Sequence, residues 1–267
     1  MAITIETVNL PDFSMDFFRF GKGERTFVIL PGLSVQSVMG AAEAIAAEYR
    51  PLTEDYTVYV FDRRKELPPV YTVADMARDT AAAMAALGLA DVYLFGASQG
   101  GMMGLLLALD YPELIKKMVL GSTTSHLLPD HSRILEKWVG LARKKDREGL
   151  YLAFGEALYP PEIFAKFRDT LLQAAATVTE EELERFIIMA EGTRDFNVTE
   201  RLPAIKCPVL AIGVFEDAVL DSDATMEIAE KLDFRPDFRL YMYVGHGHAA
   251  YDTAPDYRQR IMQFFAD

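Results

Sequence analysis

The sequence predicts an α/β protein with a mostly parallel sheet of eight strands and helices on both faces. Short apolar runs rich in β-branched and aromatic residues recur along its 267 residues. In the first half, each long gap between these runs carries a helical pattern, and this alternation is typical of βαβ units. The composition, 51% apolar and 25% charged, is typical of a globular chain with a large core.

The eight expected strands follow from the apolar runs. The first two form an antiparallel pair that opens the sheet, the next four belong to its parallel part, and the last two come late and close it. In chain order, the expected strands are residues 3–8, 17–20, 26–30, 57–61, 92–95, 117–120, 209–214 and 238–244.

Two helices of the first half have recognisable ends or faces. Thr72 followed by Asp75 three residues later is a capping box, so a helix is expected over 73–87, with Gly88 as its left-handed stop. Residues 99–109 are apolar on nearly all sides, which predicts a helix buried against the sheet.

Residues 126–200 break the alternation, because they contain helical patterns but no strand-like run. Thr179 and Glu182 form another capping box there. An amphipathic face is marked by Ile134, Leu135, Trp138 and Leu141. We expect an inserted helical cap at 126–200 and a core made of 1–125 and 201–267. The aromatic residues of the insertion form either its own core or the wall of a ligand pocket, since pockets commonly lie between subdomains.

Charge and cysteine content limit the partners and the compartment. The formal net charge of −13 argues against a nucleic-acid partner, because binding the phosphate backbone requires a basic surface. No apolar run is long enough for a membrane span, so no membrane partner is expected. The single cysteine, Cys207, cannot form an internal disulfide, and the first residues lack the pattern of a signal peptide. These features predict a cytoplasmic protein.

Ser98 is the candidate nucleophile. It is the central residue of Gly96-Ala97-Ser98-Gln99-Gly100, a G-x-S-x-G motif between an expected strand and the buried helix. A sharp turn at this junction holds the serine in a strained conformation with its hydroxyl exposed, and the glycines let neighbouring backbone pass close by. The competing interpretation is a glycine-rich turn that only packs the helix on the strand.

A serine hydroxyl is a poor nucleophile at neutral pH and needs a base, for which histidine is suited. His126 and His131 lie at the start of the insertion, whereas His246 and His248 follow the last expected strand. Because parallel strands present their carboxyl ends at one edge, the late pair is expected on the same side as Ser98. Two such histidines could also bind a metal, but no H-E-x-x-H or similar set completes a site, so no metal is expected.

The base needs a carboxylate that fixes its tautomer. The loop after residues 209–214 offers Glu216, Asp217, Asp221 and Asp223, most of which are expected at the solvated surface. Asp217, the first aspartate past the strand, is the preferred candidate, and Asp221 is the second. The other common position for such an acid is directly after the expected strand at 117–120. In this sequence, that position (residues 121–124) contains no carboxylate.

From about residue 26 to the end, the chain resembles α/β-hydrolase-fold proteins of the small esterase, lactonase and haloperoxidase-like kind. The resemblance is carried by motifs at residues 30–33 (Leu-Pro-Gly-Leu), 61–64 (Phe-Asp-Arg-Arg), 96–101 (around the serine), 207–210 (Cys-Pro-Val-Leu) and 247–252 (Gly-His-Ala-Ala-Tyr-Asp). It implies His248 rather than His246 as the base, and the backbone amides of Leu33 and Gln99 as the oxyanion hole. Pro31 stands where many members carry a histidine, which removes one polar neighbour of that hole.

The resemblance implies a serine hydrolase that cleaves a small carboxylic ester or lactone through an acyl-enzyme on Ser98, with no cofactor. Trp138, Phe154 and Phe186 are the preferred candidates for lining the substrate pocket. Other cap-side candidates are Tyr151, Phe164, Phe167 and Met189. These side chains favour an apolar acyl or aryl group in the substrate.

Several alternatives use the same fold. Ligand-binding receptors keep the triad with little turnover, and cofactor-free haloperoxidases, perhydrolases and carbon–carbon bond hydrolases use the same three residues. A scaffold that uses the fold only for packing is a further alternative. Haloalkane dehalogenases and epoxide hydrolases are excluded because they carry aspartate where this chain has Ser98. Proline iminopeptidases are disfavoured, since residues 30–34 lack their glycine-proline-rich turn.

Overall fold

The computed structural model describes residues 3–267, and its eight strands form one sheet in the order β1-β2-β4-β3-β5-β6-β7-β8. Strand β2 is antiparallel to both β1 and β4, and every other pairing is parallel. The expectation of eight strands in a mostly parallel sheet is therefore confirmed. The strands are β1 (Ile5–Asn9), β2 (Ser14–Gly21), β3 (Arg25–Leu30), β4 (Tyr56–Arg64), β5 (Val92–Ala97), β6 (Ile115–Gly121), β7 (Val209–Val214) and β8 (Phe238–Tyr243).

Helices cover both faces of the sheet, because alternate side chains of the buried strands are apolar on each side. Val28 and Leu30 of β3 join one core with α2 (Val73–Ala86), α3 (Gln99–Asp110) and α8 (Asp221–Leu232). Phe27 and Ile29 of the same strand join the other core with α1 (Ala42–Glu48) and α10 (Tyr257–Ala266). Short helical turns complete this part: η1 (Val38–Ala41), η2 (Arg50–Leu52), η3 (Thr199–Ala204) and α9 (Ala250–Thr253).

Local sequence signals determine where α2 begins and ends. The Thr72 hydroxyl accepts the amide of Asp75, and the Asp75 carboxylate accepts the amide of Thr72, so the predicted capping box is present. Gly88, just after the helix, has a φ of 68°, the left-handed conformation that glycine adopts without steric cost. These two signals bracket the helix as expected.

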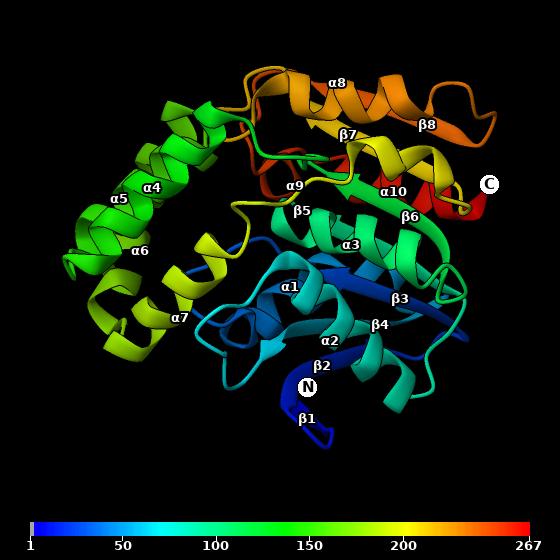
Figure 1. The fold of residues 1–267 in the computed structure, drawn as a ribbon, viewed down its shortest axis with the longest axis horizontal. Helices are drawn as coiled ribbons and strands as arrows, with labels where there is room; N and C mark the ends of the chain where they lie inside the picture. Colours follow the sequence, from blue (N-terminus) through cyan, green and yellow to red (C-terminus); the bar gives the residue numbers. More distant parts are fainter. Residues whose placement is uncertain (1–2) are drawn as a thin grey trace.

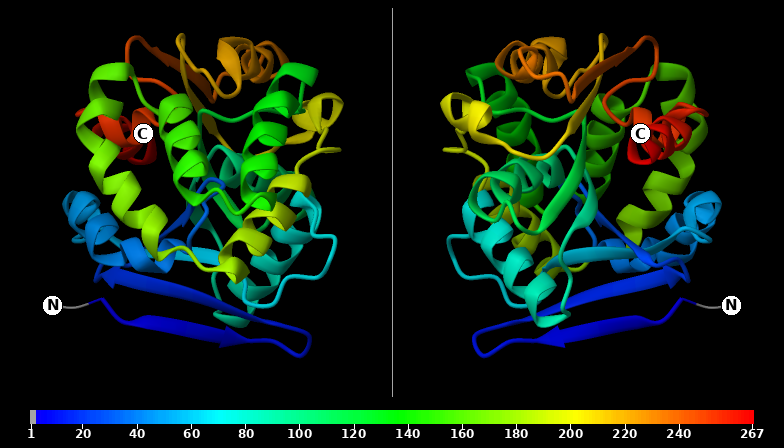
Figure 2. Two further views of the ribbon diagram at one scale, coloured as in Figure 1. Left: turned by 90° about the vertical axis from the view of Figure 1, so that its left-hand side faces the viewer. Right: turned by 90° about the vertical axis from the view of Figure 1, so that its right-hand side faces the viewer.

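Four helices lie between β6 and β7 in the sequence: α4 (Pro129–Arg143), α5 (Arg147–Leu158), α6 (Pro161–Thr177) and α7 (Glu180–Glu191). They gather beyond the arrowheads of β6 and β7, at the left of Figure 1, and they face the viewer in the left panel of Figure 2. Their apolar faces share a third core with Val219 and Leu220 from the loop after β7. The division into a core and a cap at 126–200 stays a prediction.

The carboxyl ends of β3, β5, β6 and β7 meet beneath these helices. The chain crosses over at this point, since β3 lies between β4 and β5 in the sheet. Crevices at such crossover points are where open α/β sheets bind ligands. Within residues 3–267, no helix has both the length and the apolar character needed to cross a membrane.

Candidate active site

Ser98 is the single residue between the end of β5 and the start of α3. Its backbone φ is 51° and its ψ is −120°, a conformation that costs a non-glycine residue about 1–3 kcal/mol. The surrounding structure holds it there: its amide donates to the Gly121 carbonyl at 2.9 Å. Its carbonyl accepts from the Gly101 amide at 2.9 Å and from the Thr123 hydroxyl at 2.7 Å. The predicted strained turn is therefore present, with Ser98 at its apex.

The glycines beside Ser98 allow backbone to pass where a side chain would collide. A Cβ atom on Gly100 would lie 2.0 Å from the Leu30 carbonyl oxygen, and one on Gly96 would lie 2.4 Å from that of Gly100. A Cβ on Gly32 would lie 3.1 Å from Ser98 Cβ and 3.7 Å from Ser98 Oγ. The turn after β3 thus lies directly against the serine side chain.

His248 and Asp217 meet at the same edge of the sheet. His248 Nδ1 lies 2.8 Å from Asp217 Oδ2 and 2.9 Å from Asp217 Oδ1, and both side chains are almost fully buried. Asp217 Oδ1 also accepts the amides of Val219 at 2.8 Å and Leu220 at 3.0 Å. With Nδ1 engaged by the carboxylate, Nε2 is the imidazole nitrogen left to act on a substrate or nucleophile.

The carboxyl group of Asp217 is held in its ionised form. Burial raises its pKa, but the charge and hydrogen bond of His248 and the amides of Leu220 and Val219 outweigh that effect, so its pKa is lowered. An ionised carboxylate next to Nδ1 stabilises an imidazolium and fixes the ring's orientation.

Ser98 and His248 line one small cavity of about 40 Å³. Among the described residues, the hydrogen bonds do not include one between Ser98 Oγ and the His248 ring. Such contacts are often long before substrate binds and tighten in the reacting complex. The remaining lining is Gly32, Leu33, Gln99, Met102, Leu127, His131, Leu135, Trp138, Phe154, Leu158, Thr193, Val219, Leu220 and Tyr251.

The two residues predicted to supply the oxyanion hole belong to the lining of the same cavity. Leu33 and Gln99 both line it, and Gln99 is the first residue of α3, so its amide has no acceptor within the helix. Among residues 3–267, no backbone hydrogen bond outside the helices and strands uses the Leu33 amide. The role of these two amides as oxyanion donors stays a prediction.

The structure shows which aromatic candidates of the helical segment line the cavity and which do not. Trp138 and Phe154 line the cavity, with ring centroids 4.5 Å apart. Phe186 is fully buried behind them, with its ring edge-on to Phe154 at 6.3 Å, and it does not line the cavity. Phe167 is 44% exposed on the outer surface.

Two other cap-side candidates, Tyr151 and Met189, are not among the described residues that line the cavity. The hydroxyl of Tyr151 donates to Gln36 at 2.8 Å, and the backbone carbonyl of Met189 accepts the Gln99 side chain at 2.9 Å. His246, the alternative base, has its Nδ1 3.1 Å from the Thr253 hydroxyl and does not line the cavity.

The cavity also contains a histidine that the sequence analysis did not select. His131 Nδ1 accepts the Leu128 amide at 3.2 Å, and Nε2 lies 3.1 Å from Asp221, the second candidate acid. This pair links α4 to the start of α8. The only sequence signal for it was the position of Asp221 in the acidic loop.

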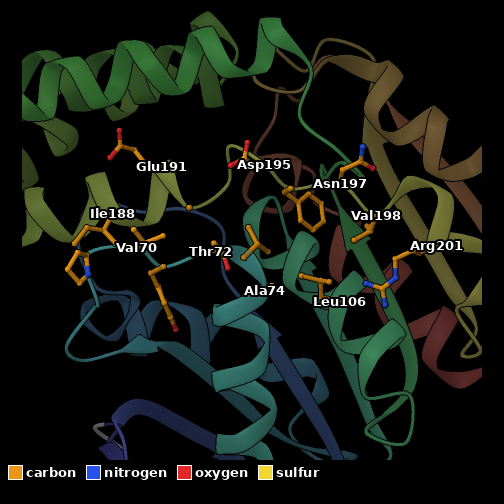
Figure 3. Close-up of a pocket in the computed structure, with 15 residues that line it drawn as sticks. Val70, Thr72, Ala74, Leu106, Ile188, Glu191, Asp195, Asn197, Val198 and Arg201 are labelled. Carbon is orange, nitrogen blue, oxygen red and sulfur yellow. The ribbon is translucent and has the colours of Figure 1, made fainter.

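A larger groove of about 450 Å³ lies between the start of α2 and the segment after α7 (Figure 3). Its charged side chains include Arg201 and Glu191, which form ion pairs with Asp110 and Arg143. None of Ser98, Asp217 and His248 lines it. Within residues 3–267, no group of three or more His, Cys, Asp or Glu side chains is arranged to hold a metal ion.

The chain is similar to known proteins both in sequence and in fold. RutD of Caulobacter vibrioides, a carbamate hydrolase by name, is 29% identical over 227 residues, which cover 82% of this chain and 84% of RutD. MGS-M2, an α/β hydrolase from a Medee basin deep-sea metagenome library, superposes with a TM-score of 0.87 at 20% identity, covering 98% of each chain. The enol-lactonase of Burkholderia xenovorans LB400 gives 0.82 at 17% identity, covering 98% of this chain and 100% of the lactonase.

A protein-family model identifies the family. The α/β hydrolase fold family model matches residues 26–255, which is most of the chain and includes Ser98, Asp217 and His248. The resemblance inferred from the five motifs is thereby confirmed. The chain belongs to the α/β hydrolase fold family.

Proposed function

We propose that the chain is a serine hydrolase that cleaves a small neutral carboxylic ester or lactone. The observation that carries the proposal is the buried His248–Asp217 contact at 2.8 Å, on the cavity that Ser98 also lines. A carboxylate, an imidazole and a serine in that order form the chemical unit that activates a hydroxyl at neutral pH.

The proposed reaction has two halves. Ser98 Oγ attacks the carbonyl carbon while His248 Nε2 takes the hydroxyl proton, and the amides of Leu33 and Gln99 stabilise the oxyanion. The carbon–oxygen bond to the leaving group breaks, and His248 returns the proton to the departing alcohol. Water then attacks the acyl carbon while His248 Nε2 takes one of its protons. The bond between the acyl carbon and Ser98 Oγ breaks, His248 returns the proton to Ser98 Oγ, and the acid is released.

The size and lining of the cavity support a small substrate. Its volume of about 40 Å³ is room for about three waters, far below the ~300–1,000 Å³ of sites that bind drug-sized ligands. No Lys, Arg, Asp or Glu is among the described residues that line it, so a charged substrate would be left without a counter-ion.

We expect kcat/KM on p-nitrophenyl esters to fall by about 100-fold from acetyl to octanoyl, because a longer acyl chain must displace packed side chains. Trp138→Ala removes part of the cavity wall and should shift the preference toward longer chains. Phe167→Ala is the matched control, since this ring lies on the outer surface. Equal rates along the series in the wild type would contradict the small cavity.

Covalent labelling tests the nucleophile directly. A fluorophosphonate probe should modify Ser98, with peptide mass spectrometry identifying the site, because the probe reacts with serines activated by a neighbouring base. A protein that is folded but unlabelled would favour a scaffold. Labelling with negligible turnover of every ester would favour a ligand-binding role.

Carbamates are the second candidate substrates, because the relatives named RutD are called carbamate hydrolases. A carbamate presents the same trigonal carbonyl to Ser98, so the assay panel should include a small carbamate beside the esters and lactones.

The absence of a cofactor and of a nucleic-acid partner, and the cytoplasmic location, stay predictions.

A further inference from the structure

Arg63 is a buried cation next to the proposed oxyanion hole. It lies near the end of β4 and is 2% exposed. Its Nη2 donates to the Pro31 carbonyl at 2.8 Å and to Gln99 Oε1 at 2.8 Å. The Gln99 side chain is buried too, and its Nε2 donates to the Met189 carbonyl of α7 at 2.9 Å.

These contacts join two loops that are far apart in the sequence. Pro31 precedes Gly32 and Leu33 in the turn after β3, whereas Gln99 follows Ser98 in the turn after β5. The proposed oxyanion donors are one amide from each turn. One guanidinium nitrogen therefore bonds to a residue of each turn.

The charge of Arg63 is not neutralised by a direct partner. Among the described residues, no ion pair joins Arg63 to a carboxylate, and its Nε has no hydrogen-bond partner. The neighbouring Asp62 carboxylate contacts Arg185 at 3.3 Å and the Ser37 hydroxyl at 2.5 Å.

Arg63 nevertheless remains charged at neutral pH. Burial lowers its pKa to about 10, while the nearby Asp62 carboxylate acts to raise it and the charge of Arg185 to lower it. A positive charge in a water-poor site stabilises a developing oxyanion more strongly than it would in water.

We propose that Arg63 is a positioning residue that holds the Pro31–Leu33 turn and the Ser98–Gln99 turn at the spacing of the oxyanion hole and supplies positive charge behind it. The inference rests on the proposed serine chemistry but concerns a residue outside the Ser98, Asp217 and His248 set. Because it acts on the transition state, its loss should appear in kcat rather than in KM.

We expect Arg63→Met to lower kcat on p-nitrophenyl acetate by about 100-fold with KM changed by less than about threefold. Arg63→Lys keeps the charge and should recover about tenfold of that loss. Arg64→Met is the matched control: it removes the same group one residue later, where the side chain contacts Glu66, Asp12 and Asp79. It should stay within about threefold of the wild type.

Amide hydrogen exchange provides a readout that does not need activity. In folded Arg63→Met, the amides of Ser98 and Gly101, which donate to the carbonyls of Gly121 and Ser98, should exchange about tenfold faster, while amides of the central strand β5 keep their protection. Unchanged exchange, or equal losses of kcat in Arg63→Met and Arg64→Met, would overturn the proposal. If the wild type hydrolyses no ester and is not labelled at Ser98, the proposed function fails, and amide exchange at the Ser98 turn still decides the positioning role.

Discussion

Ser98→Ala should lower kcat on a short-chain ester by about 10⁴-fold or more, because it removes the hydroxyl proposed to form the acyl-enzyme. The measurement compares initial rates for wild type and variant at equal folded concentration. Ser122→Ala is the matched control, since Ser122 is a buried serine with positive φ at the end of the neighbouring strand β6. The Ser122→Ala variant should keep its kcat within a few-fold of the wild-type value. Equal rates for wild type and Ser98→Ala would end the serine-hydrolase proposal.

Glycine at position 98 separates the loss of chemistry from the strain of the turn. Ser98→Gly should be as inactive as Ser98→Ala, but its folded state should be more stable by about 1 kcal/mol, because glycine adopts positive φ without steric cost. Part of this gain in stability is offset, because glycine has greater conformational freedom in the unfolded chain. Urea denaturation of both variants measures the difference, and a less stable Ser98→Gly would contradict the strain at Ser98.

Sequence patterns predicted the parts of this protein that depend on local physics. The eight strands follow from apolar runs, and the capping box at Thr72 follows from residues three positions apart, so neither needs knowledge of the tertiary structure. The Ser98 turn is similar, because glycines and a strand-to-helix junction specify it within a few residues. Helices α1, α8 and α10 were not predicted, and the acidic start of α8 was interpreted as a solvated loop.

Features that depend on tertiary packing escaped the sequence analysis. The helical pattern places Phe186 and Trp138 on inward faces, but it does not show which one meets a cavity and which one meets the core. Arg63 resembles a solvated turn residue, and its burial follows only from the convergence of Pro31 and Gln99 in space. His248 was chosen over His246 by the family resemblance, since both histidines follow the same strand.

The second large effect is expected from Asp217→Asn, which should lower kcat by about 10⁴-fold. The amides of Val219 and Leu220 both donate to Oδ1, so an asparagine keeps its carbonyl oxygen there. Its NH₂ group then faces His248 Nδ1, which must accept a hydrogen bond. The ring proton moves to Nε2, and that nitrogen can no longer take the proton of Ser98.

The pH dependence of stability provides an independent check on the same carboxylate. The pKa of Asp217 is lowered in the folded protein, so its ionised form stabilises the fold fully above the unfolded value of about 4. That contribution is lost as the pH falls through the lower folded value. The difference in unfolding free energy between wild type and Asp217→Asn should therefore be largest near neutral pH and shrink below about pH 4.

Asp223→Asn makes the same charge change on an exposed residue of the same acidic stretch and serves as the control for both measurements. It should leave both kcat and the unfolding free energy close to those of the wild type, because its side chain is exposed and is not among the described residues that line the cavity. Asp217→Asn with near wild-type kcat would remove Asp217 as the partner of His248. The 2.8 Å contact between the two side chains would then have only a structural role. The next acid to replace would be Asp221, which contacts the cavity-lining His131.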